Sequence, residues 1–243
     1  MKVAVISDVH SNFVAFKAVK ADMESIGVDV VHCLGDTVGY GPRPLECLNA
    51  VLGISKTVLK GNHEDAVCNP SREDDLNKFA IAGVRFSRKQ LTLGIIDGLE
   101  RFLYTKQLPE IDFVLCHGSY TEPSMWKYID SPAMAEEELK HTPNRFCLVG
   151  HTHNPFVFDS NRGLHRYIRQ DLKLKAEKYI INVGSVGQPR DGDCRSCYGV
   201  FNINDGKVVF NLRRVFYDIS KVEAQIREAE IPIQLAERLY SGE

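Results

Sequence analysis

The feature that most constrains this sequence is a short apolar run followed by a side chain that can bind a metal ion. In residues 30–36 (VVHCLGD), a run typical of a buried strand leads through a glycine to the carboxylate of Asp36. Four similar runs end at Asp8 and His10, at Asn62, at His117, and at His151 and His153. Ligand sites in open α/β sheets form where the carboxyl ends of strands meet loops. We therefore expect these five strand ends to converge on one site, with Asp36 between two metal ions.

Alternating strand and helix patterns open the chain. Residues 1–8 and 28–34 are predicted strands, and residues 13–26 have the apolar spacing of a helix that ends at Gly27. Such a β-α-β unit favours a parallel strand pair with a right-handed crossover. Further strands are predicted at residues 55–59, 111–116, 146–149, 155–159, 179–182, 198–202 and 207–214, with a hairpin turn signal at residues 204–206 (NDG). This mixture indicates an α/β fold in which two sheets pack together with helices outside.

The stretch from residue 64 to residue 109 interrupts the strands. It is polar at first and then has helical spacing over residues 75–90 and 92–103. We expect a helical insertion (64–109) that packs on the side of a sheet rather than a separate cap domain. Other helices are predicted from residue 44 onward and over residues 133–139, 219–230 and 233–240. Because no repeat, low-complexity tract or long linker divides the 243 residues, residues 1–243 are predicted to form one domain.

Charge and cysteine content exclude several classes of protein. A formal net charge of −2 argues against a generic nucleic-acid binder, so stable nucleic-acid binding is not expected. No apolar run approaches the ~20 residues that span a bilayer, and no secretory leader pattern is visible, so no membrane association is expected. Seven cysteines, several of them within apolar strand runs, fit a reducing compartment and hence a cytoplasmic location. Cys194 and Cys197 form a lone C-x-x-C pair, which we interpret as two incidental thiols.

The candidate ligands at the five strand ends combine two carboxylates, four imidazoles and one amide. This set excludes a thiolate zinc site and is too rich in nitrogen for a dedicated Ca²⁺ or Mg²⁺ cage. Seven ligands are too many for one transition-metal ion and suit two, particularly if one carboxylate is shared. We expect two divalent ions, with Mn²⁺ favoured and Fe, Ni²⁺ or Zn²⁺ as alternatives. Their charge exceeds that of two aspartates and a bridging hydroxide, so the site would attract a phosphate anion.

Five motifs in a fixed order carry a resemblance to a known family. They are Asp8-x-His10, Gly35-Asp36, Gly61-Asn62-His63-Glu64, His117-Gly118 and Gly150-His151-x-His153. The series resembles the calcineurin-like metallophosphoesterases, and residues 35–44 (GDTVGYGPRP) are similar to their small bacterial and archaeal, phosphodiesterase-like branch. The similarity extends from Lys2 to about Asp193 and includes residues 182–190 (NVGSVGQPR). It implies a four-layer αββα sandwich of two mixed β-sheets with flanking helices.

The resemblance also implies a role for each residue of a dinuclear site. One metal ion would be held by Asp8, His10, Asp36 and His153, and the other by Asp36, Asn62, His117 and His151. In such enzymes the histidine after the asparagine is not a ligand, so His63 would face the leaving group. A hydroxide that bridges the metals would attack phosphorus in line with the leaving oxygen, and His63 would protonate that oxygen. Asp36 and His63 are therefore the expected catalytic residues.

Three further residues are candidates for contact with the substrate, namely Asn12, Tyr40 and Arg190. Asn12 lies just beyond His10, and Tyr40 lies on the loop after Asp36. The planar guanidinium of Arg190 is suited to bidentate contact with phosphate. The loops at residues 37–44, 64–75 and 119–131 are short, which indicates an open site and a small phosphate-ester or nucleotide substrate.

Several functions share this set of residues. We expect a phosphodiesterase; the alternatives are a phosphomonoesterase or protein phosphatase, and a dinucleoside polyphosphate hydrolase. A non-catalytic binding scaffold of the same fold is a rival of another class, but such scaffolds dispense with parts of the metal site, and this chain retains His63 and all seven ligand candidates. A single-zinc hydrolase would leave several of them unused. Asp and Asn are also common turn and cap residues after strands, but their combination with histidines at five strand ends favours a site. The oligomeric state is left open.

Overall fold

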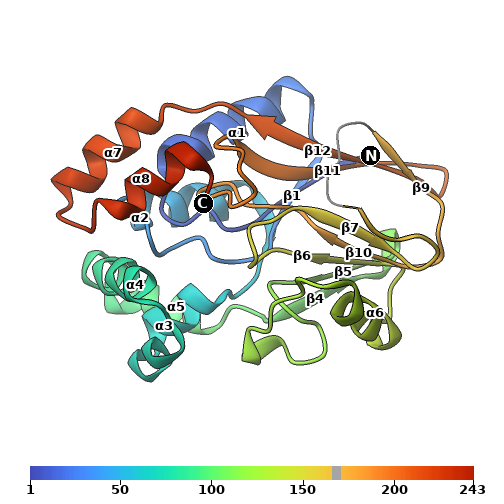
Figure 1. Ribbon diagram of the computed structural model, residues 1–243, viewed down its shortest axis with the longest axis horizontal. Coiled ribbons are helices and arrows are strands. Elements are labelled where there is room, and N and C mark those ends of the chain that lie inside the picture. The colour runs from blue at the N-terminus through green and yellow to red at the C-terminus, as the bar shows by residue number, and fades with distance from the viewer. Residues whose placement is uncertain (166–170) are drawn as a thin grey trace.

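Two six-stranded β-sheets pack face to face in the computed structural model, which describes residues 1–165 and 171–243 (Figure 1). The first sheet has the order β3 (Ser55–Val58), β2 (Val30–Cys33), β1 (Lys2–Ile6), β11 (Ser196–Asn204), β12 (Lys207–Val215) and β9 (Leu172–Leu174). The second has the order β4 (Thr105–Leu108), β5 (Phe113–Cys116), β6 (Phe146–Val149), β10 (Tyr179–Asn182), β7 (Phe156–Asp159) and β8 (Gly163–His165). Each sheet has three neighbouring parallel strands, β1 to β3 and β5, β6 and β10, and antiparallel pairs elsewhere. Both sheets are therefore mixed, as predicted.

Most of the strands that the sequence predicted have strong apolar runs; the polar edge strand β3 (SKTV) is an exception. Every residue of β5, β6 and β10 is buried, because these parallel strands are covered on both faces. The edge strand β4 (TKQL) is polar and partly exposed, and β8 and β9 have three residues each. These three strands were not predicted, because edge strands this short or polar carry no apolar pattern.

Apolar side chains divide the molecule into four layers. Between the sheets, Val5 of β1 belongs to the same buried cluster as Leu115 of β5. On the outer face of the first sheet, Ile6 packs in a cluster with Phe16 of helix α1 (Phe13–Ser25), and helix α2 (Pro44–Ile54) joins it there. On the outer face of the second sheet, Leu139 of helix α6 (Pro132–His141) packs on β5 and β6 (Figure 1). The order helix, sheet, sheet, helix confirms the αββα sandwich.

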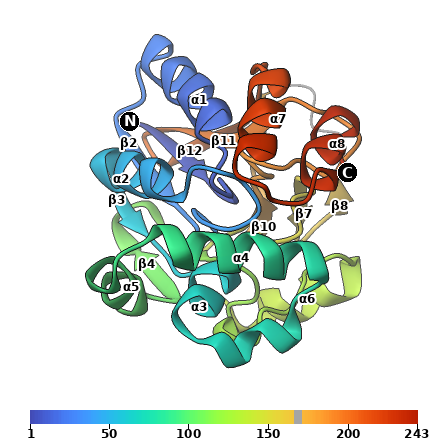
Figure 2. The same cartoon turned by 90° about the vertical axis from the view of Figure 1, so that its left-hand side faces the viewer.

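Helical elements lie between β3 and β4 (Figure 2), whereas the strand β4 itself falls within residues 64–109, where only helices were predicted. They are α3 (Asn62–Cys68), the 3₁₀ turn η1 (Pro70–Asp75), α4 (Lys78–Gln90) and α5 (Leu93–Glu100). Helix α3 was not predicted, because it has seven residues and begins within a polar motif. Val84 of α4 shares a buried cluster with Leu48 of α2 and with Val38 on the loop after β2. The insertion therefore packs against α2 and against the loop that carries Asp36.

The C-terminal part of the chain closes the first sheet and adds two helices. Asp205 and Gly206 have φ angles of 48° and 72° between β11 and β12, as a tight hairpin turn requires. Helices α7 (Ile219–Glu228) and α8 (Gln234–Ser241) pack together and on Tyr40 (Figure 2). Two further 3₁₀ turns are η2 (Pro109–Ile111) and η3 (Pro123–Met125). None of the helices in residues 1–165 and 171–243 is long and apolar enough to cross a membrane.

Candidate metal centre

The loops that follow five strands meet at one place between the two sheets. In the first sheet, the Asp8 N–H donates to the Gly35 carbonyl over 3.1 Å and the His10 N–H donates to the Asp36 carbonyl over 2.9 Å. In the second sheet, the Gly150 N–H donates to the His117 carbonyl over 2.9 Å. The His151 N–H donates to the Asp8 carboxylate over 3.1 Å and so joins the sheets. The strand ends thus converge, as the sequence led us to expect.

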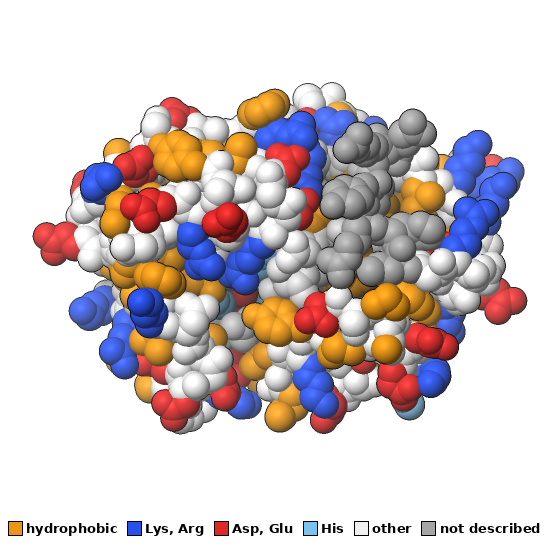
Figure 3. All heavy atoms as spheres, in the orientation of Figure 1, with side chains coloured by type: hydrophobic (Ala, Val, Ile, Leu, Met, Phe, Trp, Pro, Cys, Tyr) orange, Lys and Arg blue, Asp and Glu red, His pale blue; other side chains and the backbone are white. Residues whose placement is uncertain are grey.

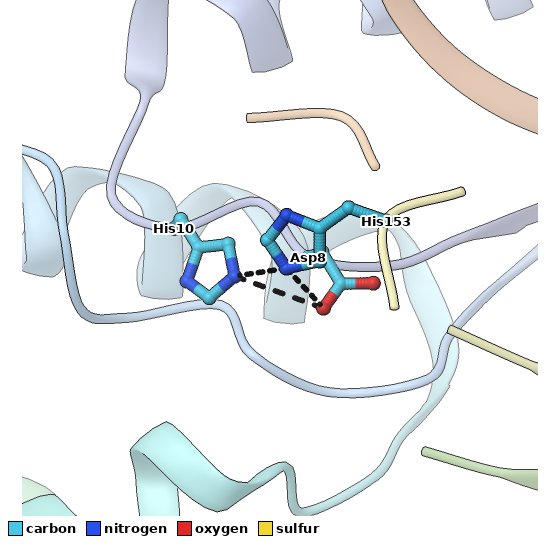
Figure 4. Close-up of side chains that lie close together, drawn as sticks. All are labelled: Asp8, His10 and His153. Carbon is cyan, nitrogen blue, oxygen red and sulfur yellow. Dashed lines mark hydrogen bonds and ion pairs between the residues drawn. The ribbon is translucent and has the colours of Figure 1, made fainter. Parts of the chain in front are cut away.

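All seven predicted ligands lie in this region. Three overlapping groups could each hold a metal ion: Asp8, His10 and His153; His10, Asp36 and His63; and Asp36, His117 and His151. Figure 4 shows the first group, whose side chains point toward one another. Asn62 joins the third group, because its Oδ1 lies 3.3 Å from His117 Nε2. The structure therefore brings together every residue of the predicted ligand set.

Each of the four candidate histidines has one ring nitrogen on a backbone carbonyl. Nδ1 faces the carbonyl in three of them: His10 faces Val38 (3.2 Å), His117 faces Leu34 (3.2 Å) and His153 faces Gln188 (2.6 Å). In His151 it is Nε2 that faces a carbonyl, that of Trp126 (2.8 Å). A carbonyl only accepts, so the nitrogen that faces it carries the proton. In His10, His117 and His153 the opposite nitrogen, Nε2, is turned toward the cluster, in the arrangement by which proteins orient metal-binding histidines.

His10 and His153 show that the cluster suits a cation. Their Nε2 atoms lie 3.0 Å apart, and each ring already places its Nδ1 proton on a carbonyl. Burial lowers the pKa of His153 to about 3, so its ring is neutral and Nε2 presents a lone pair. Asp8 Oδ1 lies 3.2 Å from this atom, is buried and has no hydrogen bond. The two ring nitrogens and the carboxylate oxygen that face one another here are donor atoms that a metal ion can bind.

Asp36 lies between the groups of ligands. Its Oδ1 accepts the His63 N–H at the start of α3 over 2.9 Å. Its Oδ2 lies 3.3 Å from His117 Nε2 and 3.6 Å from His10 Nε2. Burial raises the pKa of Asp36, but the charge of His117 and its hydrogen bond to Asp36 outweigh burial and help to hold that pKa well below its usual value. A carboxylate in this position can be shared by two ions.

The protonation of His117 fits the same requirement for positive charge. Burial opposes its charged form, but Asp36 beside it raises the pKa of His117 to about 9. A proton on this ring therefore balances part of the carboxylate charge. A metal ion that binds Nε2 displaces that proton, so metal binding here is coupled to proton release.

Glu64, the last residue of the motif Gly61-Asn62-His63-Glu64, positions the backbone around the ligands. Its carboxylate is fully buried and accepts four backbone N–H groups, from Asp36 (2.8 Å), Thr37 (2.6 Å), Val38 (3.2 Å) and Gly61 (2.9 Å). The bond from Gly61 is the reciprocal bond of a capping box, which the spacing Gly61-x-x-Glu64 could have indicated. The other three bonds fix the loop that carries Asp36 to the start of α3.

The backbone at the candidate ligands is strained. Five of the seven have a left-handed backbone conformation: Asp8 (φ 55°), His10 (47°), Asp36 (52°), His151 (64°) and His153 (58°). For residues other than glycine, each such conformation costs ~1–3 kcal/mol and persists where the surrounding structure enforces it, which is common at functional sites. The strain turns successive side chains of each loop toward the same small volume.

Glycines next to the ligands are required by close approach. A Cβ on Gly61 would lie 2.1 Å from Asp36 Oδ1, and a Cβ on Gly150 would lie 2.0 Å from Ser7 Oγ and 2.6 Å from Asp8 Oδ2. Contacts this short are not tolerated, so no other residue fits without a shift of the loops. The glycine that precedes Asn62 and the glycine that precedes His151 therefore allow the loops to meet.

A cavity of about 230 Å³ opens above the cluster. Its lining includes Asp36, Asn62, His63, His151 and His153. His63 is buried, and its Nδ1 has no hydrogen-bond partner among the described residues. Its ring centroid lies 4.6 Å from those of His10 and Tyr40. Burial lowers the pKa of His63 well below its usual value. This histidine is thus held beside the ligands, at the wall of a space that a substrate could occupy.

The three predicted substrate contacts are placed differently. Tyr40 and Arg190 line the cavity, and Arg190 Nη2 donates to the Tyr40 hydroxyl over 3.2 Å. Asn12 does not line it. Its Oδ1 accepts the Ala15 N–H as the N-cap of α1, and its Nδ2 donates to the Gly187 carbonyl. Both polar ends of Asn12 are therefore engaged within the fold.

Two aromatic residues to which the sequence assigned no role form another part of the cavity wall. Trp126 and Tyr128 line the cavity, and Tyr128 stacks on His151 with ring centroids 4.3 Å apart. Trp126 Nε1 donates to Asp65 Oδ2 of α3 over 3.2 Å. The loop after His117 is thereby tied to the helix that begins at Asn62, which encloses the His151 side of the cluster.

Comparison with known proteins extends these observations. Residues 1–206 match the calcineurin-like phosphoesterase superfamily domain. The uncharacterized protein MJ0912 of Methanocaldococcus jannaschii is 34% identical over 248 residues, which cover 99% of this chain and 98% of that protein. A metallophosphoesterase from Sphaerobacter thermophilus, known from its crystal structure, is 36% identical with a TM-score of 0.87, covering 100% of this chain and 99% of that one. The hypothetical protein PH1004 from Pyrococcus horikoshii OT3 has the same fold, with a TM-score of 0.78 at 18% identity over 100% of this chain and 98% of that one.

The match over residues 1–206 confirms the resemblance drawn from the five motifs. The family and the histidine and aspartate groups together indicate a site for divalent metal. This chain belongs to the calcineurin-like phosphoesterase superfamily.

Proposed function

We propose that this protein is a metal-dependent phosphoesterase whose single domain, residues 1–243, holds two divalent metal ions. The observation that carries the proposal is the cluster of donor atoms around His10 and His153, in which Asp8 Oδ1 is buried without a hydrogen bond. A non-catalytic scaffold has no need of such a cluster, or of His63 beside it. Asp36 Oδ2, within 3.3 Å and 3.6 Å of histidines on either side, is the atom best placed to be shared.

The ligands divide into two sets that share Asp36. The first would be Asp8, His10, Asp36 and His153, and the second would be Asp36, Asn62, His117 and His151. Divalent ions in such a pair polarise phosphoryl oxygens and lower the pKa of water toward neutrality, which supplies a nucleophile for in-line attack. The nitrogen and oxygen donors suit Mn²⁺, with Fe, Ni²⁺ or Zn²⁺ as alternatives.

His63 would act on the leaving group. Its ring lines the cavity, and its Nε2 lies 3.9 Å from Asp36 Oδ2. A negative charge on a bound substrate favours the protonated form of a nearby imidazole. His63 would then donate that proton to the departing oxygen, a contribution of about 10²- to 10⁴-fold to the rate.

We propose a phosphodiester as the substrate class. The cavity of about 230 Å³ extends beyond the ligands to Trp126 and Tyr128, which offers contact area for an organic group on the phosphate. Arg190 and Tyr40 also line the cavity, where they would contact the substrate. The cysteines are all free, which supports a reducing, cytoplasmic location.

The test is hydrolysis with defined metals. Protein stripped of metal and supplied with Mn²⁺, Ni²⁺ or Zn²⁺ is assayed on bis(p-nitrophenyl) phosphate and on p-nitrophenyl phosphate, with elemental analysis of bound metal. We expect two ions per chain and faster hydrolysis of the diester. Preference for the monoester would correct the substrate class. Two bound ions with no hydrolysis of either ester would overturn the proposed activity.

A further inference from the structure

Two arginines beside the cavity lie near each other without an acidic partner. Arg190 lines the cavity, and Arg238 belongs to the C-terminal helix α8. In the described part of the chain, no carboxylate forms an ion pair with either of them, whereas Arg72, Arg43, Arg195, Arg213, Arg214 and Arg227 are each paired with an Asp or a Glu.

The fold holds these two arginines together. The Gly192 N–H, two residues after Arg190, donates to the Gly242 carbonyl at the end of α8 over 3.0 Å. Helix α8 packs with Tyr40 in one apolar cluster, and the Arg190 guanidinium carbon lies 5.6 Å from the centre of the Tyr40 ring. The Arg238 guanidinium carbon lies 5.8 Å from the ring of Phe79, which directly precedes the cavity residue Ala80. Arg190 therefore lines the cavity, and Arg238 lies against Phe79, the residue before the cavity residue Ala80.

Each of the two guanidinium groups has an N–H group without a hydrogen-bond acceptor among the described residues. Arg190 Nη2 donates to two neutral oxygens, the Tyr40 hydroxyl (3.2 Å) and Gln188 Oε1 (2.9 Å). Arg190 Nε and Arg238 Nη1 are buried and have no partner among the described residues. A buried donor without a partner is costly, and a second positive charge nearby adds to that cost.

The electrostatics agree with this geometry. Burial and the charge of Arg190 lower the pKa of Arg238, an effect that the nearby Glu243 and Tyr40 counter in part. Figure 3 shows Lys and Arg side chains gathered at the edge of a hollow in which histidine is visible. Neither arginine forms an ion pair with a carboxylate in the described part of the chain, and a bound anion would offset their mutual repulsion.

We propose that Arg190 and Arg238 form a subsite for a second phosphate group of the substrate, one that is not hydrolysed. This rests on the proposed function, in which the reacting phosphate lies at the Asp36 cluster. Guanidinium groups bind phosphate oxygens through paired N–H donors, and two of them match a phosphate dianion. The substrate class is then a phosphodiester with an additional phosphate, as in a phosphorylated nucleotide ester. Arg238 acts as a specificity-determining residue.

Two ester substrates that differ by one phosphate test this subsite. They are the p-nitrophenyl ester of thymidine 5′-phosphate and the same ester with an added 3′-phosphate. For the wild-type enzyme with Mn²⁺, we expect a KM about tenfold lower for the second ester, the gain of one charge-assisted contact. In Arg238→Ala this gap should disappear, because the KM for the second ester rises to the KM for the first. Arg238→Lys, which keeps the charge, should retain part of the gap.

Arg227→Ala is the matched control, because Arg227 lies on the neighbouring helix α7, is exposed and is paired with Glu223. It should retain the full gap. Equal KM values for the two esters in the wild type, or a gap that Arg238→Ala leaves intact, would overturn the subsite. Titration calorimetry with thymidine 5′-phosphate and thymidine 3′,5′-bisphosphate provides a second readout that needs no turnover. Failure of the proposed function would appear instead as hydrolysis of neither ester, while the calorimetric comparison would still decide the subsite.

Discussion

Glu64 Oε2 accepts the backbone N–H of Asp36 over 2.8 Å and thereby connects the end of β2 to the start of α3. The same oxygen accepts the Gly61 N–H over 2.9 Å, so one carboxylate sets the distance between the loop of Asp36 and the loop of Asn62. In the proposed site, these two residues are ligands of the same metal ion. A buried side chain that contacts no metal thus controls how the ligands are spaced.

Replacement of Glu64 by Gln should weaken metal binding as well as stability. The amide NH₂ cannot accept the two N–H groups that one carboxylate oxygen now accepts, and buried donors left without partners should lower the free energy of unfolding by about 3 kcal/mol. Urea unfolding and calorimetric titration with Mn²⁺ measure the two effects.

The matched control is Glu138→Gln. Glu138 is a buried carboxylate on α6 that accepts the Thr121 N–H over 2.8 Å and two bonds from Ser119 Oγ. The residues that Glu138 holds, 119–121, include no candidate ligand, so the variant should lose stability and keep two metal ions. If Glu64→Gln bound Mn²⁺ as tightly as the wild type, the spacing role of Glu64 would be wrong.

His63→Ala should separate catalysis from metal binding. Because His63 is proposed to protonate the leaving oxygen, the variant should keep both ions and lose about 10²- to 10⁴-fold in kcat on an ester with a poor leaving group. The loss should be much smaller with p-nitrophenol as the leaving group, since that oxygen needs little protonation. Equal losses on the two kinds of ester would argue against an acid role for His63. Elemental analysis confirms that metal is retained.

Gly61→Ala should disrupt the site, although it adds only one methyl group. The new Cβ would lie 2.1 Å from Asp36 Oδ1 and 2.5 Å from the Asp36 backbone nitrogen, so the loop must move. Overpacking of this kind costs about 1–3 kcal/mol, and Mn²⁺ affinity should fall with it. Gly98→Ala is the control, because a Cβ at Gly98 in α5 meets nothing within 4 Å. That change should stabilise the protein by about 0.5–1 kcal/mol. Similar unfolding midpoints for the two variants would contradict the steric argument.

Metal-free protein should be most stable near pH 6.5. Burial lowers the pKa of His153 to about 3 and that of His151 to about 4. Below a pH of about 6.5 the unfolded chain therefore takes up protons that the folded chain does not, and the free energy of unfolding falls as the pH is lowered. Burial raises the pKa of Glu64 to about 6, which offsets one of these histidines.

Above pH 6.5 the trend reverses because of His117. Burial opposes its charge, but Asp36 raises its pKa to about 9, so its stabilising contribution is lost as pH rises toward that value. Urea unfolding of chelator-treated protein between pH 4 and pH 9 measures the profile. A steady rise in stability from pH 6.5 to pH 9 would show that the folded state does not hold a proton on His117.

Bound metal should raise the free energy of unfolding by an amount set by the ratio of the free metal concentration to Kd. At a free Mn²⁺ concentration of 100 times Kd, binding to one site adds ~2.7 kcal/mol to the free energy of unfolding. Asp36→Asn, which removes the shared carboxylate, should lose most of this increment at both sites. Thermal unfolding with and without Mn²⁺ measures the increment. If Asp36→Asn were stabilised as much as the wild type, Asp36 would not be the shared ligand.

The local sequence determined which segments form the strands of the two sheets. It also determined which polar side chains follow the ends of those strands. Apolar runs such as residues 146–149 are visible because strands covered on both faces need continuous apolar side chains. An Asp, Asn or His directly after such a run is also local information, and the family match agrees with it. Edge strands such as β4 escaped prediction because they are polar and need no buried face.

Only the tertiary structure decided what each polar atom contacts. The sequence shows Asn12 near His10, but the fold assigns its side chain to the N-cap of α1 and to Gly187, 175 residues away. It likewise shows Arg190 and Arg238 as unrelated residues, and the bond between Gly192 and Gly242 places them together. The pattern of side chains within a few residues is enough to identify a strand. The hydrogen bonds of a side chain, the tautomer of a histidine ring and the charged groups near it depend on chain segments that meet only when the sheets pack.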